Sequence, residues 1–158
     1  MVPLPLLAAL LAGSLAGSMT GSMTGSMAGS LAEFLIFPVT PVRVLEGFRA
    51  PADTYAPGHR GMDLVATPGQ RVSAPISGIV RFRGRIAGKD VVVISDGRRV
   101  VSLEPVRSAL AAGDEVHRGA ALGTVGSGGH CDSRCVHVGL RVDDVYLPPF
   151  AMHARLLP

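Results

Sequence analysis

Beyond residue 31, no segment of this chain keeps a 3.6-residue apolar period for long, and this limits the fold more than any other feature. The apolar residues fall instead in short runs that alternate with polar residues or consist of β-branched side chains, and glycine or proline separates most of them. Such runs are typical of strands, and short glycine turns pair neighbouring strands antiparallel. The predicted strands lie at Arg71–Ala74, Gly78–Arg83, Val91–Ile94, Arg99–Leu103, Asp114–Gly119, Ala121–Val125 and Val136–Val142. We therefore expect a mostly β protein, a compact antiparallel sheet or sandwich, in which only Val106–Ala112 could make one helical turn.

The composition fits one small domain with an aliphatic core. Of 158 residues, 47% are apolar but only 4% are aromatic, and tryptophan is absent, so valine, leucine, isoleucine and alanine must fill the core. Residues 40–158 are enough for a modest core of this kind. The formal net charge is +3, and the arginines are scattered rather than clustered. Nucleic-acid binders usually carry a dense basic stripe, so we do not expect nucleic acid as a partner.

Residues 1–37 are predicted to form a hydrophobic helix that serves as a signal peptide or a membrane anchor. No charged side chain precedes Glu33, so the apolar stretch exceeds the roughly 20 residues that span a bilayer. Glycine recurs at every fourth residue from Gly13 to Gly29, and such stripes of small residues let membrane helices approach closely. A flexible, low-complexity Gly/Ser segment is the alternative. We expect the rest of the chain to lie outside the cytoplasm, secreted or anchored in the membrane.

Prolines mark the entry into the folded part of the chain. Residues 38–47 are predicted to be a linker, with Pro38 and Pro41 within it, because prolines at this density forbid a continuous helix. Residues 48–152 then form the β domain, and residues 153–158 form a tail.

Two short segments carry residues that point to a definite chemistry, Gly58–Leu64 and Cys135–Leu140. They supply His59, Asp63 and His137, two imidazoles and one carboxylate. This is the ligand set of a catalytic zinc site that keeps one position open for water. The spacing of His59 and Asp63 is by itself weak evidence, because the same spacing suits a surface turn.

Strand geometry favours a site around His137. Side chains alternate between the faces of a strand, so His137 points away from Val136 and Val138. It shares its face with Cys135 and Gly139, and the glycine leaves room there, which suits the floor of a groove. The segment that carries the other two residues could fold over the same sheet. The alternative is that His137 is a hydrogen-bonded core histidine.

Four blocks of the chain resemble the motifs of one family, in the same order. Gly58–Leu64 resembles an H-x-G-x-D segment, and Thr67–Val80 resembles G-T-P-V-x-A-x-x-x-G-x-V. Ala112–Gly123 resembles V-x-x-G-x-x-V-x-x-G-x-x-I-G, and Cys135–His137 falls where H-x-H would stand. These are motifs of the lysostaphin-type zinc endopeptidases, which cut peptidoglycan cross-links, and ordered blocks are more specific than any one motif. The chain from about Phe48 to Phe150 therefore resembles that family.

The resemblance implies a compact, mostly antiparallel β fold in which His59, Asp63 and His137 hold Zn²⁺. It also implies two helper histidines that assist the chemistry, and this chain lacks both. Cys135 stands at the first histidine position of H-x-H, and Pro105 stands at the histidine position of a T-Y-x-H-L segment.

Two residues could replace the missing histidines as catalytic groups. Glu104 precedes Pro105 and could act as a base if its strand turns it inward, although a solvated glutamate is the alternative. His130 lies in a glycine-flanked loop that could swing towards the zinc, although an exposed loop histidine is equally compatible. His117 and His153 are expected to be structural or exposed to solvent.

Cys131 and Cys135 are the only cysteines, and in an exported domain they are expected to form a disulfide. The three residues between them could bring the Cα atoms within bonding range. The rival hypothesis is a closed structural zinc site made by the two thiolates and His137.

These observations predict a secreted or membrane-anchored, zinc-dependent metalloendopeptidase acting on peptidoglycan peptide. The alternative function is that of a catalytically impaired relative that binds peptidoglycan or regulates another cell-wall hydrolase. A third hypothesis, a membrane protein that oligomerises through its glycine stripe, explains only the N-terminus. No oligomeric state is predicted.

Overall fold

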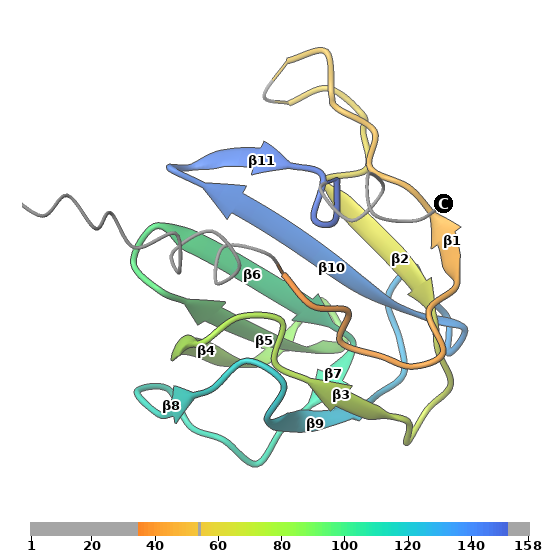
Figure 1. Ribbon diagram of the computed structural model, residues 1–158. Helices are drawn as coiled ribbons and strands as arrows, with labels where there is room; N and C mark the ends of the chain where they lie inside the picture. The colour runs from red at the N-terminus through yellow and green to blue at the C-terminus, as the bar shows by residue number, and fades with distance from the viewer. Residues whose placement is uncertain (1–34, 54, 152–158) are drawn as a thin grey trace, which may run out of the picture.

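The computed structural model describes residues 35–53 and 55–151, and within these ranges the chain forms eleven strands and no helix (Figure 1). The strands are β1 (Val44–Glu46), β2 (Gly61–Val65), β3 (Arg71–Ser73), β4 (Gly78–Ile86), β5 (Lys89–Ser95), β6 (Arg99–Glu104), β7 (Val106–Arg107), β8 (Glu115–Val116), β9 (Ala121–Val125), β10 (Cys135–Val142) and β11 (Val145–Leu147). The expected mostly β, antiparallel fold is confirmed.

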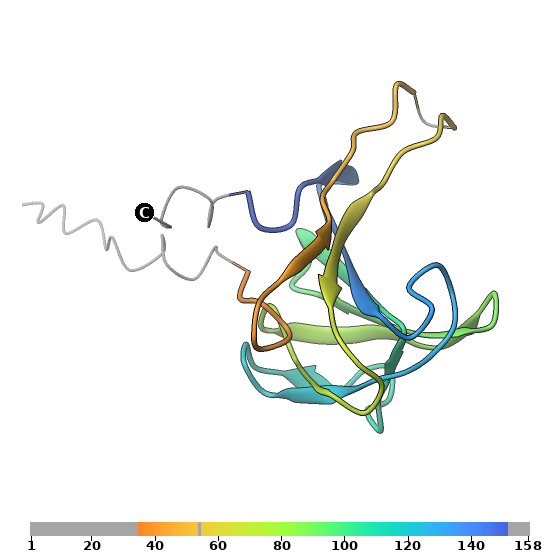
Figure 2. The same ribbon diagram turned by 90° about the vertical axis from the view of Figure 1, so that its right-hand side faces the viewer.

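The strands make two antiparallel sheets. The larger sheet has the order β1-β2-β10-β6-β5-β4-β8, and β11 also pairs with β10. The smaller sheet has the order β3-β9-β7 and lies below the larger one in Figure 1. The connection between β1 and β2 extends away from both sheets as a long loop (Figure 2). β2 and β10 are therefore interior strands, which fixes their side chains firmly against neighbours on both sides.

The core between the sheets is almost wholly aliphatic, as the composition predicts. Val136, Val138 and Leu140 of β10 are all buried in it, so the opposite face of this strand carries the intervening residues. Phe150 is the only aromatic residue that is fully part of the described core, and its ring stacks on Phe37 with centroids 4.3 Å apart.

Several predicted strands agree with the structure, and three regions differ. Residues 61–65 do not fold over the sheet but form β2 within it, between β1 and β10. The predicted linker, residues 38–47, contains β1, which pairs with β2. Val106–Arg107 is β7, because pairing with β9 gives this segment an extended backbone in place of the suggested helical turn. Tertiary pairing thus overrides weak local preference.

The predicted N-terminal helix lies mostly outside the described residues, as do His153 and the tail. Of the segment 1–37, only the last residues are described, and Leu35 is buried in the core. In residues 35–53 and 55–151 we find no helix with the length and apolarity that a membrane crossing needs.

Asp96 organises the turn between β5 and β6. One of its carboxylate oxygens accepts hydrogen bonds from the backbone N–H groups of Arg98 and Arg99, at 3.1 and 2.7 Å. The other accepts a hydrogen bond from Nε of Arg99 at 2.6 Å. Burial raises the pKa of Asp96, but the hydrogen bonds and the charge of Arg99 outweigh burial and hold the pKa below 3.8.

We expect Asp96→Ala to lower the free energy of unfolding by roughly 1–2 kcal/mol at neutral pH, because three hydrogen bonds to a carboxylate are lost. The folded-state pKa lies below the unfolded one, so this contribution is complete above pH 3.8 and disappears as the pH falls through the folded-state pKa. Urea unfolding at several pH values measures it. Glu115→Ala, at an exposed position outside this turn, is the control. Equal stability of the two variants would contradict the prediction.

Candidate metal centre

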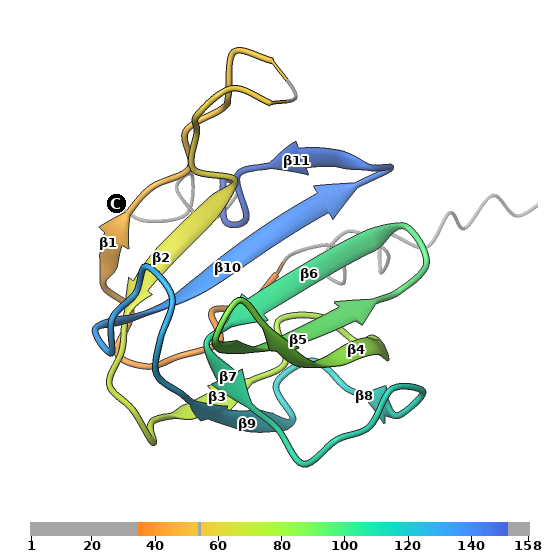
Figure 3. The same ribbon diagram turned by 180° about the vertical axis from the view of Figure 1, so that it is seen from behind.

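The register of three neighbouring strands places three functional side chains in one row. His137 of β10 pairs with Asp63 of β2 on one side and with Glu104 of β6 on the other. Directly paired residues of antiparallel strands lie on the same face of a sheet. Figure 3 shows β2, β10 and β6 side by side, with the loop that joins β9 to β10 crossing in front of β2. The row lies on the face of β10 opposite to the core.

His59 enters the cluster from the end of the long β1–β2 loop. Its backbone pairs with that of Arg49 through two hydrogen bonds of 2.9 Å, which hold the residue just before β2. Its Nδ1 lies 2.7 Å from the carbonyl oxygen of Gly47. A carbonyl only accepts hydrogen bonds, so Nδ1 carries the proton and Nε2 keeps its lone pair for the cluster.

Three atoms that can bind a metal ion converge in this cluster. Nε2 of His59 lies 3.1 Å from both Oδ1 of Asp63 and Nδ1 of His137, and the latter two atoms are 2.7 Å apart. Ligand atoms about 2.0–2.2 Å from a tetrahedral zinc lie about 3.3–3.6 Å from one another. The triangle therefore needs only a small expansion to accept the ion, and its donor set of two imidazoles and a carboxylate suits zinc.

Burial keeps this triangle in place. The side chain of Asp63 is 3% exposed, and those of His59 and His137 are 10% and 12% exposed. Burial raises the pKa of Asp63, but hydrogen bonds from His137 and His130, together with their charges, outweigh burial and lower the pKa below 3.8. Asp63 is therefore a carboxylate, the form that binds a cation.

His130 reaches the same cluster from the loop between β9 and β10. Its Nε2 lies 3.1 Å from Oδ2 and 3.2 Å from Oδ1 of Asp63. The side chain is 46% exposed, far more than the other two histidines. His59, Asp63, His130 and His137 together form a group whose ligand atoms lie within 4.8 Å of one another. Proximity alone thus allows His130 to act as a fourth ligand or as a separate catalytic group.

The predicted disulfide is present and anchors the His130 loop. Cys131 and Cys135 are joined, with Cα atoms 4.9 Å apart, and both side chains are buried. Cys135 begins β10 two residues before His137, so the bond ties His130 to the strand that carries the other histidine. Disulfide sulfurs are not thiolates, so they do not supply the ligands of the thiolate zinc site that the sequence left open.

Glu104 lies beside His137 in the register, but an ion pair holds its carboxylate. Nζ of Lys89 lies 2.6 Å from Oε1 of Glu104, and the two side chains are 20% and 17% exposed. The glutamate is therefore not freely solvated, and its Oε1 is held by Lys89 rather than by a residue of the triangle. His117 is exposed and lies away from the cluster, as expected.

Two glycines have roles different from those that the sequence suggests. Gly139 does not leave open space beside His137, because a side chain there would meet Oγ of Ser102 at 2.6 Å. Room for the imidazole comes instead from Gly61 of β2, where a Cβ would overlap the His137 ring and the carbonyl oxygen of Val138. Sequence reasoning missed Gly61, Gly47 and Lys89, because only strand pairing brings them to the site.

Comparison with known proteins identifies the family. A sequence model of Peptidase family M23 matches residues 57–149, which include the whole cluster. The chain belongs to peptidase family M23. An uncharacterized Mycobacterium tuberculosis protein, Rv2891, is 36% identical over 102 residues, 63% of this chain and 41% of its relative. The chain thus spans about two fifths of the length of the mycobacterial relatives it matches.

Solved structures share the M23 fold. A zinc-containing peptidase from Vibrio cholerae superposes with a TM-score of 0.63 at 20% identity, covering 73% of this chain and 39% of that one. The catalytic domain of the prophage-encoded M23 protein EnpA from Enterococcus faecalis, an A109H mutant, gives a TM-score of 0.59 at 25% identity. That match covers 69% of this chain and 87% of the EnpA domain. Membership of M23 supports zinc as the ion that the triangle fits.

In this M23 chain, Gly61→Ala should weaken zinc binding about tenfold or more, because the added Cβ displaces the His137 ring or the β10 backbone. Gly47→Ala is the matched control. A Cβ there meets no atom within 4 Å, and the carbonyl that orients His59 is kept. Competition with a chelating dye measures the zinc Kd, and circular dichroism checks that both variants fold. Wild-type affinity in a folded Gly61→Ala protein would contradict the assignment.

Proposed function

We propose that this chain is a zinc-dependent metalloendopeptidase that hydrolyses peptide bonds of bacterial peptidoglycan. The observation that carries the proposal is the convergence of His59, Asp63 and His137 within 3.1 Å of one another on adjacent, buried parts of an M23 domain. These three residues hold the ion in the proposed enzyme. When bound, zinc supplies a Lewis acid that polarises the scissile carbonyl and activates water.

The chain's own residues prepare that site before substrate arrives. The carbonyl of Gly47 holds Nδ1–H of His59, so the ring presents Nε2 in the correct tautomer. Asp63 is ionised and nearly inaccessible to water, so water screens little of its negative charge within the cluster. The β10 backbone fixes the position of His137, and the absence of a side chain at Gly61 leaves room for its ring. Preorganisation of this kind removes reorganisation from the reaction step.

His130 is the proposed proton carrier. Its Nε2–H donates to the Asp63 carboxylate, which leaves Nδ1 as the nitrogen that takes a proton from the attacking water and returns it to the nitrogen of the leaving amine. Three facts support this role: the imidazole contacts Asp63, it is half exposed, and its loop is anchored by the adjacent disulfide. A positioned acid or base of this type contributes about 10²–10⁴-fold to the rate. His130 thereby replaces the histidines whose positions Cys135 and Pro105 occupy.

Glu104 suits this task less well, because its carboxylate is committed to Lys89 at 2.6 Å. We propose a positioning role for the pair: it packs beside His137 and under the glycines that precede His130. A Cβ at Gly129 would meet Cδ of Lys89 at 2.8 Å, which shows how closely the loop rests on the lysine.

We also propose that the domain works outside the cytoplasm, secreted or held at a membrane by the N-terminal segment. The disulfide between Cys131 and Cys135 supports this location, because such bonds persist in oxidising compartments. The second candidate function is a catalytically impaired M23 relative that binds peptidoglycan or regulates another hydrolase. The absence of histidine at positions 105 and 135 favours that alternative.

The decisive experiment uses the full-length protein in a mild neutral detergent, because its first 37 residues are strongly apolar. We expect one zinc per chain by elemental analysis, and release of new amino groups from peptidoglycan or from Gly- and Ala-containing cross-bridge peptides. His137→Ala should lose both zinc and cleavage, whereas His117→Ala, which removes an exposed histidine, should lose neither. Zinc binding without cleavage of any such substrate favours the impaired relative, and absence of zinc contradicts the site.

His130→Ala distinguishes a proton carrier from a fourth metal ligand. We expect its zinc content to equal that of the wild type while kcat falls about 10²–10⁴-fold, because proton transfer is lost and the triangle is kept. Steady-state kinetics and elemental analysis on the same preparation test this. If zinc is lost as completely as in His137→Ala, the site is closed by four ligands and His130 has no catalytic role.

A further inference from the structure

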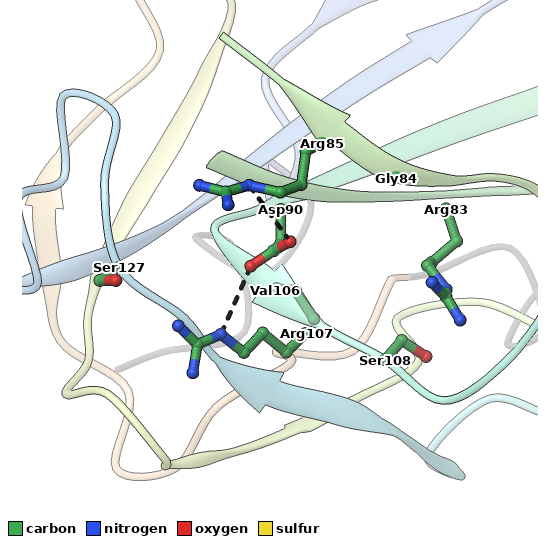
Figure 4. Close-up of a pocket in the computed structure, with 8 residues that line it drawn as sticks. All are labelled: Arg83, Gly84, Arg85, Asp90, Val106, Arg107, Ser108 and Ser127. Atoms are coloured by element: carbon green, nitrogen blue, oxygen red, sulfur yellow. Dashed lines mark hydrogen bonds and ion pairs between the residues drawn. The ribbon is translucent and has the colours of Figure 1, made fainter. Parts of the chain in front are cut away.

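A basic pocket lies between the β4–β5 hairpin and β7 of the smaller sheet (Figure 4). Its volume is about 450 Å³, within the range of small-ligand sites. The lining residues are Arg83, Gly84, Arg85, Asp90, Val106, Arg107, Ser108 and Ser127. Three arginines and a single carboxylate line the pocket, so its lining carries two unbalanced positive charges.

Asp90 pairs with two of the arginines through their Nε atoms and leaves other N–H donors of their guanidinium groups available. Its carboxylate lies 3.4 Å from Nε of Arg107 and 4.0 Å from Nε of Arg85. Nη2 of Arg85 also donates to the carbonyl of Gly88 at 2.9 Å. Among the described residues, the two Nη groups of Arg107 make no hydrogen bond or ion pair. Figure 4 shows both guanidinium groups directed to the side of the pocket where Ser127 lies.

Arg85 and Arg107 are largely exposed to solvent and therefore accessible to a ligand. The side chains of Arg85 and Arg107 are 72% and 66% exposed, whereas Asp90 is 28% exposed. Arg83 lines the other end of the pocket, where its Nε donates to the carbonyl of Leu110 at 3.0 Å. The planar fork of a guanidinium matches the two oxygens of a carboxylate, and such charge-assisted pairs are the stronger hydrogen bonds.

The pocket adjoins the metal centre through one short stretch of chain. Ser127 lines the pocket, and His130 contacts Asp63 only three residues later. Consecutive Cα atoms are 3.8 Å apart, so the Cα atoms of Ser127 and His130 lie at most about 11 Å apart. At Gly126 the same chain passes close to Asp90, because a Cβ there would meet Oδ2 of Asp90 at 3.6 Å.

We propose that this pocket is a subsite for a free carboxylate on the peptide substrate, about three or four extended residues from the bond at the metal centre. The inference rests on the proposed function for the identity of the substrate, but the binding itself needs no metal. An oxyanion of a phosphate-containing wall polymer offers similar chemistry. We favour a peptide, because the pocket adjoins the proposed site of peptide hydrolysis through residues 127–130 and Asp90 leaves only two positive charges unbalanced.

The test compares two N-acetylated tri-alanine peptides, one with a free C-terminal carboxylate and one with a C-terminal amide. The receptor is metal-free, isotope-labelled full-length protein in neutral detergent, and the readout is the shift of the backbone signals of Arg107 and Ser127. We expect the free-carboxylate peptide to bind about tenfold more tightly than the amide. Arg107→Gln should abolish that difference, and Arg107→Lys should keep part of it, because a lysine retains charge without the fork.

Arg98→Gln is the matched control. Arg98 lies in the turn between β5 and β6 and pairs with Asp143 on the surface, so its loss removes the same charge outside the pocket. Equal affinity for the two peptides, equal effects of Arg98→Gln and Arg107→Gln, or signal shifts with inorganic phosphate but not with the carboxylate peptide would each overturn the subsite.

Kinetics separates this inference from the proposed function. If the enzyme is active, Arg107→Gln should raise KM for a carboxylate-bearing substrate about tenfold and leave kcat within twofold. The His137→Ala protein should still prefer the carboxylate peptide over the amide. Absence of cleavage by the wild-type protein together with that preference contradicts the peptidase and keeps the subsite, whereas wild-type cleavage without the preference does the reverse.

Discussion

The antiparallel register of β2, β10 and β6 is the constraint on which the rest of this structure depends. It places Asp63, His137 and Glu104 in one row, because directly opposed residues share a face. A slip of one residue would turn His137 into the core and bring Val136 or Val138 to the surface. Those two valines are completely buried, so core packing and the geometry of the site are held by the same pairing.

Around this rigid row, the remaining groups come from loops that local contacts restrain. His59 is oriented by the carbonyl of Gly47, and His130 is tied to β10 by the disulfide that follows it. Lys89 supports the glycines of the His130 loop while it neutralises Glu104. Loops that bring functional groups to a fixed sheet are common at binding and catalytic sites. The arginine pocket uses the same loop through Ser127, so substrate binding and proton transfer would share one structural element.

The sequence predicted the fold class well because alternation and glycine turns are local signals. β9 coincides with its predicted run, and β3, β6 and β10 each differ by one residue at an end. β2 escaped prediction because Gly61–Val65 is buried on an interior strand and lacks a clear alternation of polar and apolar residues. The role of Gly61 was equally hidden. The His137 ring, which needs the space at this glycine, lies on a strand about 75 residues away, and only the closing of that long stretch of chain brings the two together.

The chemistry of the site was determined by the sequence alone: two imidazoles, one carboxylate and a pair of cysteines are residue identities, and ordered motifs point to their family. Only the tertiary structure decided how they meet. It brought His130 to Asp63 and committed Glu104 to Lys89, although the sequence offered both residues as candidate catalytic groups. The physical reason is that donor and acceptor types are written in the chain, whereas distances across a sheet arise from strand pairing and from the packing that makes one register stable.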